Sequence, residues 1–294
     1  MNDRTKETIK RIASALVALP VYFFAIITSS FQDIPLVVIS LVISMICLLE
    51  FYQISEREEG KPFIAAGMVM AFLVNIIMYL FAFGKVYGYN SMVGAFDARL
   101  MFAVIVLFLA VLAFLQLFQR PLKGGIYSLS VTVFGVIFIV LSFSHIILMK
   151  ALKDGLYYIL ILNATVMLND TGAYFGGVLF GKHKTKFPAS PNKSWEGYFS
   201  GLLFSMLGMM IINQVFASFF GRNLFTMVEA ALIGMGLSFF GSIGDLIESA
   251  VKRDGIIKDS GSIIPGHGGM WDVFDALIVT TPLFYYYLIV KGIP

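Results

Sequence analysis

The sequence has few of the residues that characterise a soluble protein. Only 13% of its 294 residues are charged and 59% are hydrophobic, whereas a typical soluble domain has about 25% charged and roughly 45–50% apolar residues. With a single cysteine the chain can form no intrachain disulfide, and we expect Cys47 to be a packing residue. The net charge of +3 is too small to indicate a nucleic-acid partner. The composition therefore favours a protein that lies in a lipid bilayer.

Long apolar runs recur from end to end of the chain. About 20 apolar residues in a helix cross a hydrocarbon core of roughly 30 Å, and a helix satisfies its own backbone polar groups there. We therefore expect an all-α integral membrane protein with about nine transmembrane helices, at residues 12–28, 34–54, 63–83, 100–118, 125–147, 156–181, 197–219, 227–251 and 272–290. The first run follows basic residues, as in a signal peptide, but we expect it to remain as the first transmembrane helix.

Lysine and arginine are shared unevenly between the two sides of these helices. If the N-terminus is cytoplasmic, fifteen of the 21 basic residues fall in cytoplasmic segments and six on the opposite side. Basic residues are enriched in cytoplasmic loops. The sequence therefore predicts a cytoplasmic N-terminus, an outer C-terminus and a location in the cytoplasmic (inner) membrane.

The two halves of the chain differ in polarity. Within the five apolar spans of residues 1–155 the ionisable exceptions are Glu50 and His145, and we expect each to be a helix-end or packed polar residue rather than a ligand. Residues 156–294 place carboxylates, lysines and glycines inside or beside apolar helices. We expect the first half to be a lipid-facing scaffold and the second to hold the active site, within a single membrane-embedded unit.

Asp170 is the first unusual polar residue of the second half. A charged side chain near the bilayer centre costs about 2.5–3.5 kcal/mol on insertion scales, so Asp170 should face a partner or a wet cavity. The nearby Gly172 and Gly176 have the small-residue spacing of closely packed helices. We therefore interpret the glycines as packing residues and Asp170 as a functional one.

The loop that follows is basic and rich in short donors. Ser190, Asn192 and Lys193 offer groups suited to phosphate oxygens, and Pro191 stiffens the turn between them. The lysines of this loop have a second interpretation, because such charges commonly set the orientation of a membrane protein.

A polar stripe marks the eighth helix. Its members Asp245, Glu248, Ser249 and Lys252 occupy positions i, i+3, i+4 and i+7, which places them on one face about 100° wide. Two carboxylates on adjacent turns repel each other, and Lys252 neutralises only one of them. A divalent cation with hard oxygen ligands would compensate the remaining charge.

A polar, glycine-rich segment joins this helix to the last one. Its basic members match phosphate, its glycines allow a ligand to approach the backbone, and two aspartates then share one helical face. The residues concerned are Lys252, Arg253, Lys258, Asp259, His267, Asp272 and Asp275.

Carboxylates, lysines and an embedded lipid-facing bundle together favour metal-assisted phosphoryl or nucleotidyl transfer. The chain contains no Walker A string and no evident Ser-His-Asp arrangement. An ion or solute transporter is an alternative from another class, because buried charges also mark transport pathways. Such transporters usually contain internal repeats, which this sequence lacks.

These motifs resemble those of the phosphatidate cytidylyltransferases, also called CDP-diacylglycerol synthases. The C-terminal signature comprises Ser249-Ala-Val-Lys252-Arg253, Lys258-Asp259-Ser-Gly261, Pro265-Gly266-His267-Gly268-Gly269 and Asp272-x-x-Asp275. The upstream motifs are Asp170-Thr-Gly-Ala-Tyr174, Phe180-Gly-Lys-His-Lys184, Ser190-Pro-Asn-Lys193-Ser-Trp195-Glu196-Gly197 and Gly244-Asp245-Leu-Ile-Glu248-Ser249. The resemblance covers roughly residues 165–280. Val178 and Val273 stand where the family usually has basic residues.

The resemblance implies that CTP and phosphatidate react to give CDP-diacylglycerol and pyrophosphate. It implies Mg²⁺, as one ion or two, with metal ligands among Asp170, Asp245, Glu248, Asp272 and Asp275. Catalytic residues would be Asp245, Asp272, Asp275 and Lys252. Substrate-binding residues would be Ser190, Asn192, Lys193, Arg253, Lys258, Asp259 and His267. The active site would face the cytoplasm, and glycine-rich helix faces permit a homodimer. A CTP-dependent lipid-alcohol kinase is the alternative enzyme.

Overall fold

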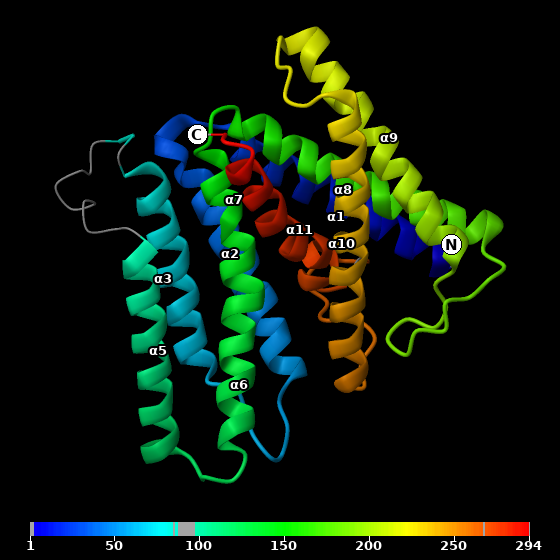
Figure 1. The fold of residues 1–294 in the computed structure, drawn as a ribbon. Helices are drawn as coiled ribbons and strands as arrows, with labels where there is room; N and C mark the ends of the chain where they lie inside the picture. The colour runs from blue at the N-terminus through cyan, green and yellow to red at the C-terminus, as the bar shows by residue number, and fades with distance from the viewer. Residues whose placement is uncertain (1–2, 85, 88–97, 267, 294) are drawn as a thin grey trace. The chain divides into compact units, whose positions relative to one another are not determined.

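The computed structural model of the chain is built from helices. It describes residues 3–84, 86–87, 98–266 and 268–293, and for residues 3–13, 15 and 98 it describes only the backbone. Within these ranges extended pairing is limited to two isolated bridges, Lys184 with Ser194 and Ile264 with Gly268. The helices (Figure 1) are α1 (Asp3–Ile27), α2 (Ile34–Ile54), α3 (Ile64–Phe83), α5 (Ala98–Gln119), α6 (Gly125–Gly135), α7 (Ser142–Lys150), α8 (Gly155–Phe180), α9 (Trp195–Phe220), α10 (Met227–Asp254) and α11 (Trp271–Val290).

Each of the nine predicted apolar segments is helical, which confirms the all-α prediction. The fifth is a continuous helical run in which a π-helical stretch, Val136–Leu141, joins α6 to α7. Among the described residues seven helices are long and apolar enough to cross a membrane. Helix α8 is not one of them, since it carries polar residues such as Asn163, Asn169 and Asp170. Helix α1 is not counted either, because its apolar part, Leu16–Ile27, is shorter than the other spans. The side of the membrane on which each loop lies stays a prediction.

The chain forms two compact units. Unit 1 comprises Met1–Ala151 and Gly255–Val273, and unit 2 comprises Leu152–Asp254 and Phe274–Pro294. Helix α11 begins in unit 1 and continues in unit 2. The predicted organisation, a scaffold of residues 1–155 and a catalytic part of residues 156–294 in one membrane-embedded unit, stays a prediction.

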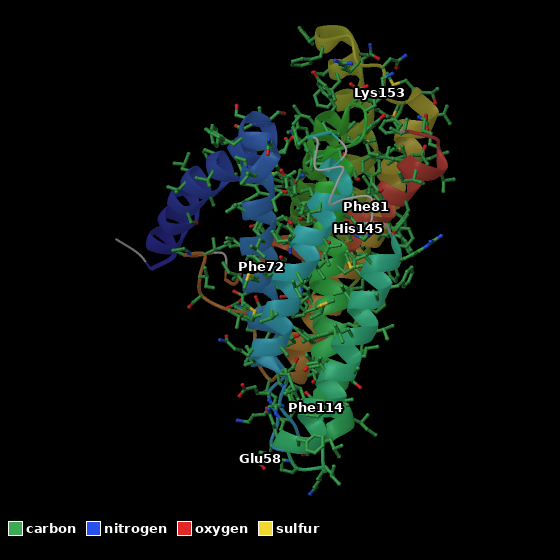
Figure 2. All side chains as sticks on the ribbon, turned by 90° about the vertical axis from the view of Figure 1, so that its left-hand side faces the viewer. Glu58, Phe72, Phe81, Phe114, His145 and Lys153 are labelled. Atoms are coloured by element: carbon green, nitrogen blue, oxygen red, sulfur yellow. The ribbon has the colours of Figure 1, made fainter. Side chains whose placement is uncertain are left out.

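Unit 1 has an apolar interior with a few paired polar groups. Cys47 is fully buried, as expected for a packing residue. The Nδ1 atom of buried His145 lies 2.8 Å from the Leu141 carbonyl, which confirms that this histidine is a packed polar residue. On the outer faces of α3 and α5, Phe72, Phe81 and Phe114 are exposed by 49%, 44% and 60% (Figure 2). Apolar side chains so exposed suit contact with lipid.

Unit 2 depends on close contacts between helix backbones. A Cβ atom at Gly176 of α8 would lie 2.1 Å from the Ser200 hydroxyl of α9, so a larger residue would separate these helices. The predicted packing role of this glycine is confirmed. Helix α9 is joined to α10 by a bond from the Ser205 hydroxyl to the Gly234 carbonyl oxygen (2.7 Å), and α8 to α10 by a bond from the Ser238 hydroxyl to Asn169 Oδ1 (2.6 Å).

Candidate active site

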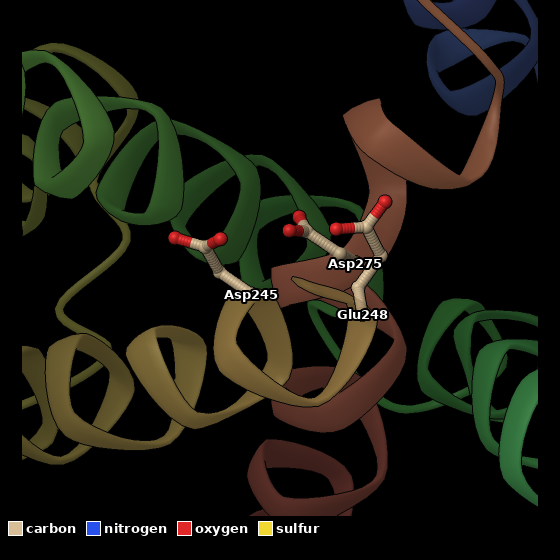
Figure 3. A group of neighbouring side chains, drawn as sticks. All are labelled: Asp245, Glu248 and Asp275. Carbon is tan, nitrogen blue, oxygen red and sulfur yellow. The ribbon is translucent and has the colours of Figure 1, made fainter. Parts of the chain in front are cut away.

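Three carboxylates meet where α10 packs against α11 in unit 2. One oxygen from each of Asp245, Glu248 and Asp275 lies within 4.8 Å of the other two. Figure 3 shows Asp245 and Glu248 projecting from successive turns of α10, with Asp275 reaching toward them from α11. Glu248 is buried, whereas Asp245 and Asp275 are partly exposed. We call these three residues the acidic cluster.

The glycine before Asp245 allows the two helices to approach. A Cβ atom at Gly244 would lie only 2.6 Å from the carbonyl oxygen of Asp275. Real Cβ atoms do not approach a backbone oxygen so closely. The two helices can therefore lie this close together only because residue 244 has no side chain. The distance between the carboxylates of α10 and that of α11 is therefore set by backbone packing.

Two lysines pair with the acidic cluster. The Lys252 ammonium lies 2.7 Å from a carboxylate oxygen of Glu248, one helical turn away, as the predicted polar stripe requires. The Lys193 ammonium forms an ion pair with Asp245, 52 residues further along the chain. Three carboxylates thus face two cations within unit 2, and the arrangement keeps an excess of negative charge when all of these groups are ionised.

Lys193 is presented by a small structured loop between α8 and α9. The Thr185 amide donates to the Lys193 carbonyl oxygen (2.9 Å), beside the isolated bridge of Lys184 and Ser194. The Ser194 hydroxyl then caps α9 by accepting from the Gly197 amide at 3.2 Å. The predicted short turn therefore ends in a capped helix, and this cap places Lys193 next to the start of α9.

The electrostatic environment of Lys193 shows which carboxylates surround it. Burial lowers the pKa of its ammonium group, and the negative charges of Asp275, Asp170 and Glu248 act in the opposite direction. Lys193 is therefore close to the acidic cluster and also to Asp170 on α8. Asn169 donates to Asp170 Oδ1 at 3.2 Å, so the Asn169 amide links Asp170 to the Ser238 contact on α10.

The remaining candidates of unit 2 lie on or beside the loop that carries Lys193. The Arg253 guanidinium donates from Nε to the Ala189 carbonyl oxygen at 3.4 Å. The Asn192 carbonyl oxygen accepts from Lys184 Nζ at 2.9 Å, and the Asn192 side chain is exposed. Ser190 is partly exposed. The structure thus brings Arg253 to this loop. Such proximity is required if Arg253 and the loop are to bind the same ligand.

The other candidates belong to unit 1. Asp272 at the start of α11 accepts three hydrogen bonds at Oδ2, from the Ser260 amide (2.9 Å), the Ser260 hydroxyl (2.9 Å) and the Gly269 amide (2.7 Å). Lys258 and Asp259 are exposed, and His267 lies outside the described residues. In this structure Asp272 therefore holds the loop in front of α11, and its predicted metal role stays a prediction.

Glu50 is a residue of this region whose partners sequence reasoning missed. It lies near the end of α2 and is 2% exposed, which confirms it as a packed polar residue at a helix end. Its carboxylate accepts from the amides of Met270 (2.9 Å) and Trp271 (2.8 Å), more than 200 residues away. The available signal was a lone carboxylate within an otherwise apolar run, which indicates a buried partner without identifying it.

The acidic cluster has the chemistry of a divalent metal site. Carboxylate oxygens are hard ligands of the kind that Mg²⁺ and Ca²⁺ prefer. A bound divalent cation would also remove the mutual repulsion that the two lysines leave uncompensated. The donor set of Asp245, Glu248 and Asp275 therefore fits a metal ion of this class.

Comparison with known proteins identifies the family of the chain. The family model described as the cytidylyltransferase family matches residues 9–290 of the chain. The chain belongs to the cytidylyltransferase family. The match covers the acidic cluster, Lys193 and Glu50 together, and it confirms the resemblance of the motifs. A transporter is not favoured by this family membership.

Curated relatives of this cytidylyltransferase family member are known from staphylococci. Over 137 residues the chain is 44% identical to a protein named phosphatidate cytidylyltransferase from Staphylococcus haemolyticus (strain JCSC1435), and 42% identical to one of the same name from Staphylococcus aureus (strain COL). Each alignment covers 47% of this chain and 51% of the relative. The chain thus spans about half the length of the curated relatives that it matches.

Proposed function

We propose that this protein transfers the cytidylyl group of CTP to phosphatidate, giving CDP-diacylglycerol and pyrophosphate. The observation that carries the proposal is the acidic cluster with its two lysines, set among helices able to cross a membrane. Both substrates are anionic phosphates, and one of them is a lipid. Membership of the cytidylyltransferase family and the names of the staphylococcal relatives support the same reaction.

In the proposed reaction a phosphate oxygen of phosphatidate forms a bond to the α-phosphorus of CTP. The bond between that phosphorus and the oxygen bridging to the β-phosphate breaks, and pyrophosphate leaves with the electron pair. Asp245, Glu248 and Asp275 would hold Mg²⁺, with Asp170 and Asp272 as further candidate ligands. When bound, the metal supplies positive charge that lowers the repulsion between the two substrates.

The protein's own cations would bind the phosphates. Lys193 and Lys252 form ion pairs with Asp245 and Glu248 of the acidic cluster, and each ammonium can transfer its hydrogen bonds to phosphate oxygens when substrate enters. The further residues proposed to bind CTP or the lipid phosphate are Ser190, Asn192, Arg253, Lys258 and His267, and Asp259 would position the nucleotide or its loop. We further propose that the site faces the cytoplasm from the inner membrane, and that two copies of the chain form a homodimer.

The test is to purify the protein in detergent and supply CTP, phosphatidate and Mg²⁺. We expect cytidine-labelled lipid and pyrophosphate in equal amounts. Asp245→Asn should abolish most of the turnover, because it removes a proposed metal ligand and the ion-pair partner of Lys193. The matched control is Asp154→Asn in the same unit, where the wild-type carboxylate pairs with Arg222 at 2.8 Å, away from the acidic cluster in sequence. This control should retain activity.

The identity of the leaving group decides against the alternative enzyme. Release of CDP with phosphorylation of a lipid alcohol would show a CTP-dependent lipid-alcohol kinase and contradict the proposal. Undiminished turnover in Asp245→Asn would contradict the proposed role of the acidic cluster.

A further inference from the structure

The first turn of α11 is tied to α2 by one buried carboxylate. Glu50 Oε1 accepts from the Met270 amide at 2.9 Å, and Oε2 accepts from the Trp271 amide at 2.8 Å and the Ser260 hydroxyl at 3.0 Å. All of these residues lie in unit 1. The amides at the start of a helix have no partner within it, so a carboxylate placed there satisfies them and also faces the positive end of the helix dipole.

The surrounding backbone is shaped around this carboxylate. A Cβ atom at Gly261 would lie 2.5 Å from Glu50 Oε1, and one at Gly269 would lie 2.6 Å from both Glu50 oxygens. Two glycines of the loop thus leave room that a side chain would fill. The contact of Glu50 with the loop consequently depends on both sides, the buried acid on α2 and the small residues before α11.

Asp272 completes the arrangement from within α11. Its Oδ2 atom accepts from the amides of Ser260 and Gly269 and from the Ser260 hydroxyl, which also lies within hydrogen-bond distance of Glu50. The loop that ends in Gly269 is therefore held between the carboxylates of Glu50 and Asp272. Every described contact of Glu50 is with an N–H or O–H donor, which is the pattern of a structural anchor rather than a metal ligand.

The position of Glu50 matters because of what α11 carries. The helix is continuous from Trp271, whose amide Glu50 binds, to Asp275 four residues later. That separation is slightly more than one helical turn, so rotating or unwinding the first turn would displace the Asp275 carboxylate. A shift of about 1 Å at a reacting centre can cost about 10²-fold in rate.

We propose that Glu50 is a positioning residue for the nucleotidyl transfer: it anchors the first turn of α11 and thereby the orientation of Asp275. This inference rests on the function proposed above. Glu50 itself contacts neither substrate nor metal in this role. Because it acts through Asp275, its loss should weaken metal activation as well as turnover.

The test compares Glu50→Gln with Ser40→Ala in full-length protein. Glutamine has nearly the shape of glutamate, but its amide nitrogen cannot accept from a backbone N–H. One of the two bonds from the Met270 and Trp271 amides is therefore lost. Ser40 is a buried polar residue of the same helix whose hydroxyl donates to Asn75 at 3.0 Å, within unit 1. Ser40→Ala therefore controls for the general effect of losing a buried hydrogen bond in α2.

We expect Glu50→Gln to lower kcat by about 10- to 100-fold and to raise the Mg²⁺ concentration for half-maximal activity by about 10-fold, as loss of a supporting group commonly does. Ser40→Ala should keep both values. Hydrogen exchange at the Met270 and Trp271 amides should accelerate in Glu50→Gln only. If Glu50→Gln does not fold, Ser260→Ala removes the hydroxyl that contacts both Glu50 and Asp272, and it should lower kcat by about 3- to 10-fold.

Wild-type kcat and Mg²⁺ dependence in folded Glu50→Gln would overturn the proposed role. Unchanged hydrogen exchange at the Met270 and Trp271 amides in this variant would overturn it as well. If the wild-type protein shows no cytidylyl transfer, the proposed function fails instead. Exchange measured on that same preparation still decides separately whether Glu50 anchors α11.

Discussion

Gly244→Ala is the sharpest test of how the acidic cluster is assembled. The added methyl group would meet the Asp275 carbonyl oxygen at 2.6 Å and the Ala276 Cα at 3.2 Å. Ordinary contact begins at 3.4 Å, so α10 and α11 must separate by about 0.8 Å at this point. The obstacle is backbone, which cannot rotate away as a flexible side chain can.

Two effects follow from this separation. Overpacking of a close contact typically costs about 1–3 kcal/mol of stability. A displacement of nearly 1 Å between Asp275 and the two carboxylates of α10 should also lower kcat by about 10- to 100-fold. Because the methyl group touches no substrate, we expect the requirement for Mg²⁺ to rise while the product stays the same.

The same helix offers a matched control. A Cβ atom at Gly236 would have no neighbour within 4 Å, and alanine is favoured over glycine in a helix by about 1 kcal/mol. Gly236→Ala should therefore keep wild-type activity with equal or greater thermal stability in detergent. Activity is measured as CTP-dependent pyrophosphate release over a Mg²⁺ titration. Wild-type kcat and Mg²⁺ dependence in Gly244→Ala would refute the view that backbone contact sets the geometry of the cluster.

Three further outcomes are expected. Treatment with EDTA should abolish pyrophosphate release and Mg²⁺ should restore it; activity that persists after thorough chelation would contradict metal-assisted transfer. Lys193→Gln should lower kcat by about 10²-fold or more, as loss of a group that stabilises transition-state charge does, whereas Lys186→Gln on the same loop, where the lysine is exposed, should have little effect. Asn169→Ala removes the buried bond to Ser238 and should lower the unfolding free energy by about 1–3 kcal/mol; an unchanged melting temperature in detergent would argue against this link between α8 and α10.

Local patterns in the sequence were sufficient for the helices and for part of the site. All nine predicted apolar segments are helical because the length of each run and the bilayer's demand for satisfied backbone groups leave little alternative. The pairing of Glu248 with Lys252 follows equally from helical periodicity, since i and i+4 share a face. The stripe that includes Asp245 likewise required no knowledge of other helices.

Long-range partners were beyond such patterns. Lys193 could be interpreted as a topogenic charge or as a phosphate ligand, and only the fold shows it paired with Asp245. Asp272 and Asp275 share a helical face in the sequence, yet Asp272 holds the loop of unit 1 whereas Asp275 joins the acidic cluster of unit 2. Periodicity cannot separate two such aspartates, because their different partners come from distant parts of the chain.

The sequence by itself determined that this protein is a helical membrane protein with the motifs of a cytidylyltransferase, because hydropathy and residue spacing are local properties. Tertiary structure alone decided which carboxylates meet. It also decided that Glu50, one acid in an apolar helix, binds the start of α11 more than 200 residues away. The physical reason is that a buried carboxylate must find donors wherever packing brings them, and the location of those donors is a property of the whole fold.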